Sequence, residues 1–131
     1  MLFDLLVLDG DFYAAMVNND IKAIELIRSS KDVALPLIVI GELLGGFHHG
    51  NRFEKNSDGL KEFLAKPTCR VLMPSFETSE IYGKLYSELR ESGKMIPTND
   101  LWIAALVIEY EGVLGSFDKH FKSIDRLKLV A

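Results

Sequence analysis

The apolar residues of this chain fall into short runs that are separated by polar, glycine or proline residues. Short continuous apolar runs between such turn signals are typical of strands that are buried on both faces. The pattern predicts four strands of this kind and a fifth at the edge of the sheet, at residues 5–8, 33–35, 70–73, 113–117 and 127–130.

The segments between these runs carry apolar residues at helical spacing. Ile81, Leu85 and Leu89 recur every fourth residue, which indicates an amphipathic helix over residues 78–90. Further helices are predicted at residues 20–30, 37–46, 61–66 and 98–111. Residues 50–59 are rich in glycine, asparagine and charge, and we expect them to form a surface loop.

The segment from Leu35 to Phe47 is ambiguous, because the run LIVI at residues 37–40 is mostly β-branched and would equally suit a strand. We favour a helix over residues 37–46 that begins after Pro36 and ends near Gly45 and Gly46. This interpretation places Glu42 alone on an apolar helix.

Strands that alternate with helices at this spacing predict a parallel sheet with helices on both faces. The chain has 131 residues and 48% apolar content, enough for one compact domain with a sizeable core. We therefore expect a single three-layer α/β/α domain over residues 1–131, with a central parallel sheet of four to five strands.

Composition and charge indicate the cellular compartment and the kind of surface that the protein has. Cys69 is the single cysteine, which excludes an internal disulfide and suits a reducing compartment. Asp4 and Asp9 interrupt the first apolar run, so neither a secretory leader nor a membrane-spanning helix is expected there. These observations favour a cytoplasmic protein. The net charge of −4 argues against a surface that is basic throughout, although four basic residues gather near the end of the chain: Lys119, Lys122, Arg126 and Lys128.

Acidic residues stand where the predicted elements meet. Asp9 and Asp118 follow the predicted strands 5–8 and 113–117, and ligands of parallel sheets bind at the carboxyl ends of strands. Asp100 lies in the first turn of the predicted helix 98–111, after two residues that suit a helix cap, Thr98 and Asn99. The helix dipole favours an ionised carboxylate at that position.

If these acids and Glu42 converge, their mutual repulsion requires divalent cations, and Mg²⁺ or Mn²⁺ takes carboxylate oxygens as ligands. A lone acid on a buried helix such as Glu42 is costly unless it is paired or binds metal. An acidic metal site with an open coordination position suits the hydrolysis of phosphodiesters. The residues alone do not indicate the substrate.

Four motifs resemble the PIN-domain ribonucleases, and within them the VapC-type toxins of toxin–antitoxin pairs. In chain order they are LDGD at residues 8–11, GELLGG at 41–46, NDLWIAA at 99–105 and LGSFDKHF at 114–121. The family usually has a hydroxyl residue where Gly10 stands, and Asn or Ser where Asp11 stands. The other motifs match in order over nearly the whole chain.

The resemblance implies a catalytic site of four acids, namely Asp9, Glu42, Asp100 and Asp118. It implies that Asn99 or Ser116 supports them by hydrogen bonds, and that Asp9, Asp100 and Asp118 are the metal ligands. It also implies an endoribonuclease that depends on Mg²⁺, with Mn²⁺ as a substitute ion. The implied assembly is a homodimer with a small antitoxin whose tail covers a groove.

Simpler interpretations stay open at this stage. Asp9 and Asp11 could form only a turn around Gly10, and Asp100 could serve only as a helix cap. His120 and the basic cluster could contact phosphate or form a solvated surface, while Trp102 suits core packing. A PIN-like domain that only binds RNA or protein is the main alternative function. A phosphoacceptor receiver domain is disfavoured, because the strand 70–73 runs into Pro74 without the required aspartate.

Overall fold

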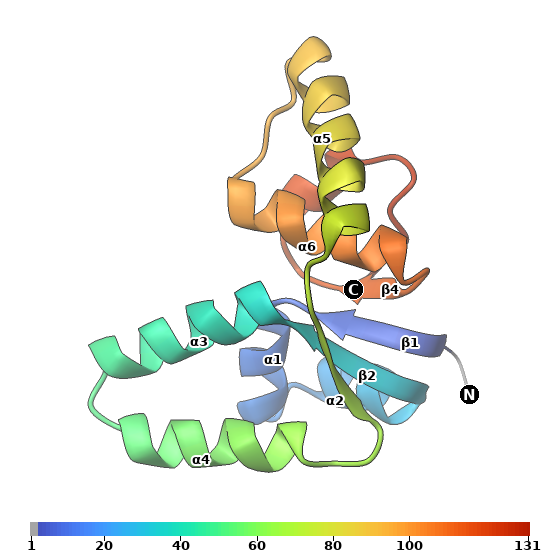
Figure 1. The fold of residues 1–131 in the computed structure, drawn as a ribbon. Coiled ribbons are helices and arrows are strands. Elements are labelled where there is room, and N and C mark those ends of the chain that lie inside the picture. The colour runs from blue at the N-terminus through green and yellow to red at the C-terminus, as the bar shows by residue number, and fades with distance from the viewer. Residues whose placement is uncertain (1–2) are drawn as a thin grey trace.

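The computed structural model describes residues 3–131 and contains an all-parallel sheet of five strands in the order β3-β2-β1-β4-β5. The strands are β1 (Phe3–Leu8), β2 (Ser30–Pro36), β3 (Cys69–Leu72), β4 (Val113–Gly115) and β5 (Leu129–Val130). The helices are α1 (Gly10–Val17), α2 (Ile21–Arg28), α3 (Leu37–His49), α4 (Phe53–Leu64), α5 (Phe76–Glu91), α6 (Thr98–Glu109) and the short 3-10 helix η1 (Lys119–Ser123). Helices flank the sheet (Figure 1), so the predicted fold class is confirmed.

The first apolar run forms the centre of the sheet. Leu5, Leu6, Val7 and Leu8 are all buried, as a strand covered on both faces requires. Strand β1 pairs with β2 on one side and with β4 on the other, and β3 and β5 form the two edges. The prediction of a last edge strand at 127–130 is therefore confirmed, although the strand is shorter than expected.

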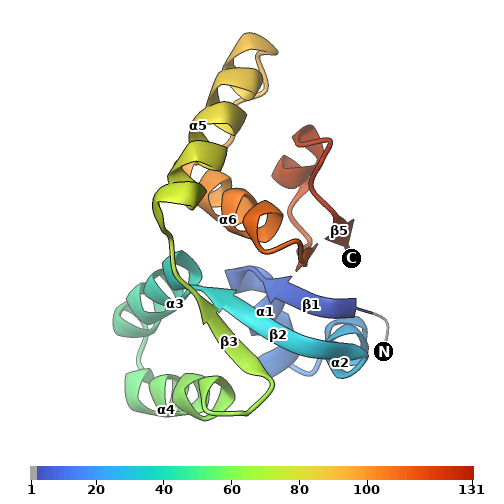
Figure 2. The same ribbon diagram turned by 45° about the vertical axis from the view of Figure 1, so that its right-hand side comes forward.

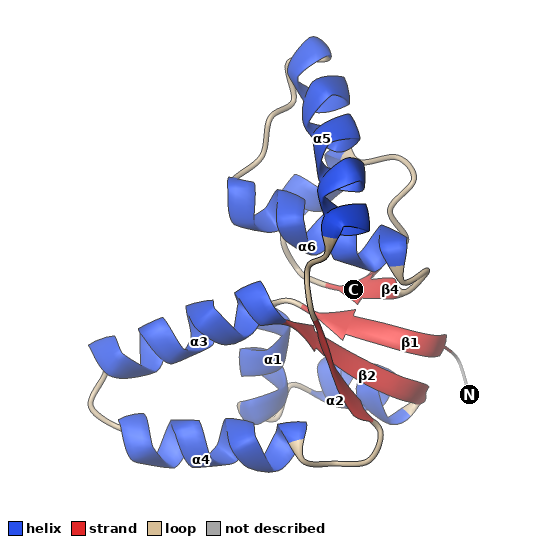
Figure 3. Cartoon of the chain, in the orientation of Figure 1, coloured by secondary structure: helices blue, strands red, loops and turns tan. Residues whose placement is uncertain are grey.

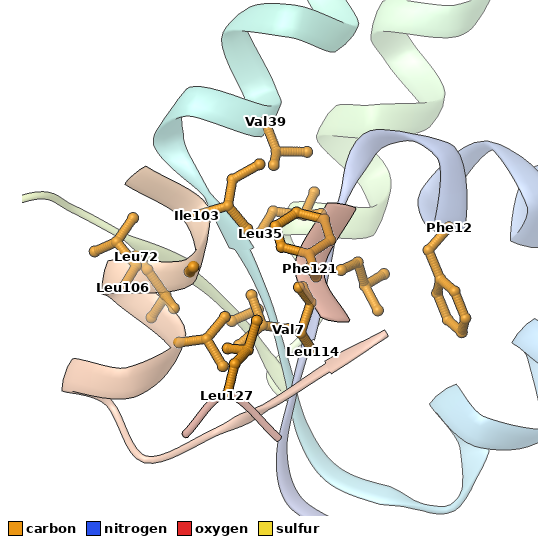
Figure 4. Packing of buried hydrophobic residues seen from close by; sticks show 14 of the residues in the cluster. Val7, Phe12, Leu35, Val39, Leu72, Ile103, Leu106, Leu114, Phe121 and Leu127 are labelled. Atoms are coloured by element: carbon orange, nitrogen blue, oxygen red, sulfur yellow. The ribbon is translucent and has the colours of Figure 1, made fainter. Parts of the chain in front are cut away.

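Helices α5 and α6 pack against each other on one side of the molecule, and α1 and α2 lie on the other (Figures 1 and 2). Trp102 of α6 stacks on Tyr82 of α5 with ring centroids 4.2 Å apart, so the prediction that Trp102 packs is confirmed. Ile103 and Leu106 of α6 join the hydrophobic core around the sheet, as Figure 4 shows. No helix within residues 3–131 is long and apolar enough to span a lipid bilayer.

The loop predicted at residues 50–59 is wrong, because α4 begins at Phe53. Its buried residues Ser57, Leu60 and Phe63 recur every third residue, and Leu60 and Phe63 belong to the hydrophobic core. Gly59 lies on the exposed face, where its low helix propensity is offset by tertiary packing. Figure 3 shows α3 and α4 as a pair of long helices joined by a short loop.

Three other predictions about helices are wrong. Helix α3 continues through Gly45 and Gly46 to His49, because both glycines lie on its exposed face while Phe47 packs against the core. Helix α1 directly follows Asp9, where the pattern indicated only a turn. Gly112 does not end α6; the helix ends at Glu109, and Gly112 is buried against β1.

Candidate acidic site

The site begins where β1 and β4 end side by side. Leu8 of β1 pairs with Gly115 of β4, so the next residues along each chain segment, Asp9 and Ser116, become neighbours. Both side chains are buried, with exposed fractions of 6% and 5%. The Ser116 hydroxyl donates a hydrogen bond to Oδ2 of Asp9. Asp9 therefore lies at the carboxyl end of a strand, as predicted, and forms a buried polar pair with Ser116 there.

Asp9 is also the N-cap of α1. Its Oδ1 accepts a hydrogen bond of 2.9 Å from the backbone N–H of Phe12, which satisfies one of the free donors at the helix start. Both carboxylate oxygens thus have a partner within the protein. Asp11 is exposed in the first turn of the same helix and caps nothing, but its charge acts on Asp9.

Burial raises the pKa of Asp9 from its ordinary value of 3.8 to about 6. The hydrogen bonds from Ser116 and Phe12 oppose this rise, and the charges of Asp11 and Asp100 add to it. Asp9 therefore sits in an environment that disfavours its ionised form. A cation near Asp9 would reverse this preference, because it would stabilise the carboxylate directly.

Ser116 connects Asp9 to Asp118. The backbone N–H of Asp118 donates a 3.0 Å hydrogen bond to the same Ser116 oxygen whose hydrogen is donated to Asp9. The hydroxyl thus uses its one donor and one of its acceptor positions. The Oδ1 atom of Asp118 accepts a 2.8 Å hydrogen bond from the backbone N–H of His120, so Asp118 is the N-cap of η1. A single serine therefore fixes two of the predicted acids relative to each other.

Asp100 joins this group through a histidine that the sequence did not assign to it. Nδ1 of His120 lies 3.3 Å from Oδ2 of Asp100 and 3.2 Å from Oδ1 of Asp118. The interpretation that His120 belongs to a basic phosphate-contacting or solvated surface missed this contact. Its spacing of two residues after Asp118, within a short helical turn, was the only signal.

The pKa of Asp100 is raised, whereas the helix dipole alone predicted a favoured carboxylate. Partial burial is the main cause, opposed by the hydrogen bond with His120, and the charges of Asp118 and Glu42 add to the rise. Thr98 and Asn99 do not cap α6: Pro97 is the N-cap and makes no side-chain hydrogen bond there. The predicted cap is wrong, and the first turn of α6 faces other acids instead.

Glu42 is exposed on α3, so the cost that burial of a lone acid would carry does not apply to it. The α3 helix buries Val39 and packs other apolar side chains, while Glu42 is exposed and contacts Asn99 at the start of α6. Nδ2 of Asn99 donates a 3.2 Å hydrogen bond to Oε2 of Glu42. Asn99 thus supports Glu42, and the pairing expected from the resemblance has a geometric counterpart.

The donor set suits a divalent cation. Within residues 3–131, Asp100, Asp118 and His120 each offer one ligand atom, and these atoms all lie within 4.8 Å of one another. Carboxylate oxygens suit Mg²⁺, and one imidazole nitrogen is also compatible with Mn²⁺. Asp9 and Glu42 are not part of this group of three, and they connect to it through Ser116 and through charge.

Known proteins match both the sequence and the fold. The PIN domain model matches residues 6–127. Ribonuclease VapC2 of Rickettsia felis is 32% identical over 107 residues, which are 81% of this chain and 78% of that protein. Ribonuclease VapC1 of Haemophilus influenzae is 28% identical over 97 residues, which are 73% of this chain and 71% of that protein.

Two solved structures share the fold. One is VapBC2 from Rickettsia felis bound to a DNA fragment from its promoter, with a TM-score of 0.82 and 27% identity over 96% of this chain and 97% of that chain. The other is VapBC-1 from nontypeable Haemophilus influenzae, with a TM-score of 0.83 and 24% identity over 96% of both chains. Because the family model spans most of the chain and the relatives are VapC proteins, the chain belongs to the PIN domain family, in its VapC group.

Proposed function

We propose that this chain is an endoribonuclease that requires a divalent cation and acts as the toxin of a VapBC-type toxin–antitoxin pair. The observation that carries the proposal is the convergence of Asp9, Asp100 and Asp118 around Ser116 and His120 at the carboxyl ends of β1 and β4. Membership of the VapC group supports RNA as the substrate, since the relatives are named ribonucleases.

Asp9, Asp100 and Asp118 are the proposed cation ligands, and Mg²⁺ is the proposed ion, with Mn²⁺ as a substitute. A bound divalent cation would neutralise charge on the scissile phosphate and supply an activated water as nucleophile. Ser116 holds Asp9 in place through its hydroxyl, and Phe12 does so through its backbone N–H. These contacts keep the carboxylate oriented before any ligand binds.

Glu42 is assigned a different role, because it is exposed and Asn99 already holds one of its oxygens. Its other oxygen is available to accept a hydrogen bond from the attacking water. Glu42 and the proposed cation ligands Asp9, Asp100 and Asp118 complete the four-acid catalytic site. Asn99 and Ser116 are then supporting residues, each bound to a different acid.

The proposed antitoxin site is a groove between α1, α3 and α4, with a volume of about 490 Å³. Apolar side chains line much of it, together with Lys55 and Lys66, so it suits an amphipathic segment. The main apolar lining residues are Tyr13, Val17, Leu43, Phe47 and Phe63. Solved VapBC relatives support an antitoxin as the partner.

A second copy of the chain is the proposed partner at the open edge of the sheet. Strand β3 is an edge strand, and Val71, Met73 and Phe76 are exposed there. Leu37, at the start of α3, is also exposed, and the pairing of Pro36 with Leu72 brings it to the same edge. An apolar edge of this kind is protected when another subunit covers it. We call Leu37, Val71, Met73 and Phe76 the edge patch.

The domain bounds of the chain and its cellular compartment complete the proposed function. We take residues 1–131 as a single PIN domain, since the family model covers residues 6–127. A cytoplasmic location suits an RNA substrate and the unpaired thiol of Cys69.

One observation favours a second candidate, a PIN-like domain that only binds RNA or protein. Both oxygens of Asp9 already accept hydrogen bonds within the protein, and Asp9 lies outside the group of three residues that could share one ion. If these bonds keep Asp9 from a cation, the cluster would bind ligands without cleaving them.

Incubation of the purified protein with total RNA separates these candidates. The nuclease proposal predicts discrete fragments with Mg²⁺ or Mn²⁺ and none with EDTA. RNA that stays intact although it binds the folded protein with cation present would support the binding-only candidate and contradict the nuclease.

A further inference from the structure

An exposed aromatic residue, Phe117, stands in the chain between two residues of the acidic site. Phe117 follows Ser116, which binds Asp9, and precedes Asp118, which contacts His120. Its Cα is therefore about 3.8 Å along the chain from each of them. The side chain remains 44% exposed, although apolar rings of this size are usually buried.

The ring has a rigid support. Phe117 stacks on Phe12 with ring centroids 5.2 Å apart and an interplanar angle of 28°. Phe12 is fully buried, and its ring packs so closely on Gly115 that a Cβ added there would lie 3.1 Å from the ring. Phe12 also donates its N–H to Asp9. Phe12, which supports the Phe117 ring, thus belongs to the first turn of α1, and the buried Asp9 is the N-cap of that helix.

We propose that Phe117 is a stacking platform for an unpaired base of the substrate RNA next to the cleaved phosphodiester. This inference rests on the proposed function and names the kind of RNA that the site takes. Bases stack on aromatic side chains when they are not paired, and every base offers such a face. The preferred substrate is therefore single-stranded at the cleaved position.

The charge of the surroundings makes this contact valuable. Asp9, Asp100, Asp118 and the exposed Asp11 place negative charge beside the phosphate backbone, so electrostatic attraction at the site depends on the bound cation. Stacking on Phe117 depends little on salt. The ring supplies uncharged binding next to a group of acidic residues.

Phe117→Leu tests the platform, because leucine still covers Phe12 but offers no aromatic face. Binding is measured in an Asp100→Asn background with Mg²⁺, so that the RNA stays uncut. The probe is a single-stranded oligonucleotide that contains the bond cut by the wild-type protein. In further versions of the probe, the base on one side of that bond or the base on the other side is removed. Tyr110→Leu is the matched control, since Tyr110 is exposed at the opposite end of α6 from Asp100.

We expect Phe117→Leu to weaken binding of the intact probe about tenfold and Tyr110→Leu to leave it unchanged. Removing the stacked base should weaken binding to the parent protein by a similar factor but have no further effect on the Phe117→Leu variant. Plots of affinity against salt should be parallel for the two proteins, and Phe117→Trp should restore binding.

Equal binding of the intact probe by parent and Phe117→Leu would overturn the platform. So would a loss from base removal that is the same in both proteins, or a loss that Phe117→Trp does not restore in a variant that melts like the parent. Failure of the proposed function looks different: either the wild-type protein cuts no RNA, or Asp100→Asn still cuts it.

Discussion

At the scale of single residues, Asp9 carries the largest energetic cost in the site. A carboxyl group whose pKa rises from 3.8 to about 6 on folding disfavours folding once it is ionised, by about 3 kcal/mol at neutral pH. The folded state binds this proton more tightly than the unfolded state does. Stability from Asp9 is therefore fully present below pH 3.8 and is lost as the pH rises through about 6.

Replacing the ionisable group should remove this pH dependence. In EDTA, we expect Asp9→Asn to gain stability over the wild type as the pH rises from about 4 to 6, approaching about 3 kcal/mol at pH 7. Urea unfolding at several pH values measures the difference. Asp4→Asn is the control, because Asp4 is exposed on β1. If the free energies of unfolding of Asp9→Asn and wild type differ by the same amount at every pH, the raised pKa of Asp9 is contradicted.

Ser116 gives a second test with a single residue, because it is buried and forms hydrogen bonds with both Asp9 and Asp118. Ser116→Ala should cost about 1–3 kcal/mol in the free energy of unfolding, because a buried carboxylate loses its donor and a backbone N–H loses its acceptor. Cleavage should fall about 10- to 100-fold, as expected for a residue that orients a metal ligand. Wild-type cleavage by this variant would show that Asp9 needs no such support.

The sequence revealed the acids but not all of their contacts. Asp9 and Asp118 could be predicted because a strand's carboxyl end is visible as the end of an apolar run. His120 could not, because its contact with Asp100 joins residues twenty positions apart through the tertiary fold. The exposure of Glu42 depends on how α3 is rotated against its neighbours, and an apolar run that has little periodicity leaves that rotation open.

At the scale of elements, the close packing of α1 on β4 sets the position of the site. Gly115 has no side chain where the Phe12 ring lies, and Phe12 lies three residues after Asp9 in α1. Gly112, at the other end of the same segment, makes a comparable approach to Leu5 and Val7 of β1. One glycine therefore lies beside the site and the other lies remote from it.

These two glycines give a matched pair. Gly115→Ala and Gly112→Ala should each destabilise the fold by about 1–3 kcal/mol, because the new methyl groups overpack their surroundings. Gly115→Ala alone should also lower cleavage by folded protein, since it displaces Phe12 and with it Asp9. Thermal unfolding and cleavage below the melting temperature measure the two effects. Equal activity of the two variants would mean that the packing of α1 on β4 does not position Asp9.

The elements themselves were predictable where the pattern had one interpretation. The strands of the sheet and helix α5 follow from apolar runs and from clear periodicity. Only the last residues of helix α4, within the predicted helix 61–66, were expected to be helical, because glycine, asparagine and charge disguised a stripe of buried residues further upstream. Helix α1 was missed because Asp9, Gly10 and Asp11 match a turn as well as they match a helix start.

At the scale of the whole molecule, the edge patch is the exposed apolar surface that a second copy would cover. Phe76 is 76% exposed at the first position of α5, and Ile21 is 73% exposed at the first position of α2. Glutamate suits both positions, because a negative charge stabilises the start of a helix. Phe76 and Ile21 are therefore comparable: both are exposed apolar residues at helix starts, and only Phe76 belongs to the edge patch.

Phe76→Glu should dissociate the proposed dimer, whereas Ile21→Glu should leave it intact. A charge at the centre of an apolar interface is desolvated without a partner, so the dimer dissociation constant should rise at least about a hundredfold. Sedimentation at several protein concentrations measures it. A dimer that tolerates Phe76→Glu, or a wild-type chain that is a monomer at every concentration, would exclude the edge patch as the interface.

The most direct test of the whole account is cleavage of a defined RNA by Asp100→Asn beside Asp4→Asn, each with Mg²⁺. Asp100 lies at the carboxyl ends of the strands with His120, and Asp4 lies near the opposite end of β1. We predict that Asp4→Asn cuts like the wild type, while Asp100→Asn loses about a thousandfold or more in rate and melts no lower than the wild type. An Asp100→Asn protein that is folded and cuts at the wild-type rate would contradict the acidic site.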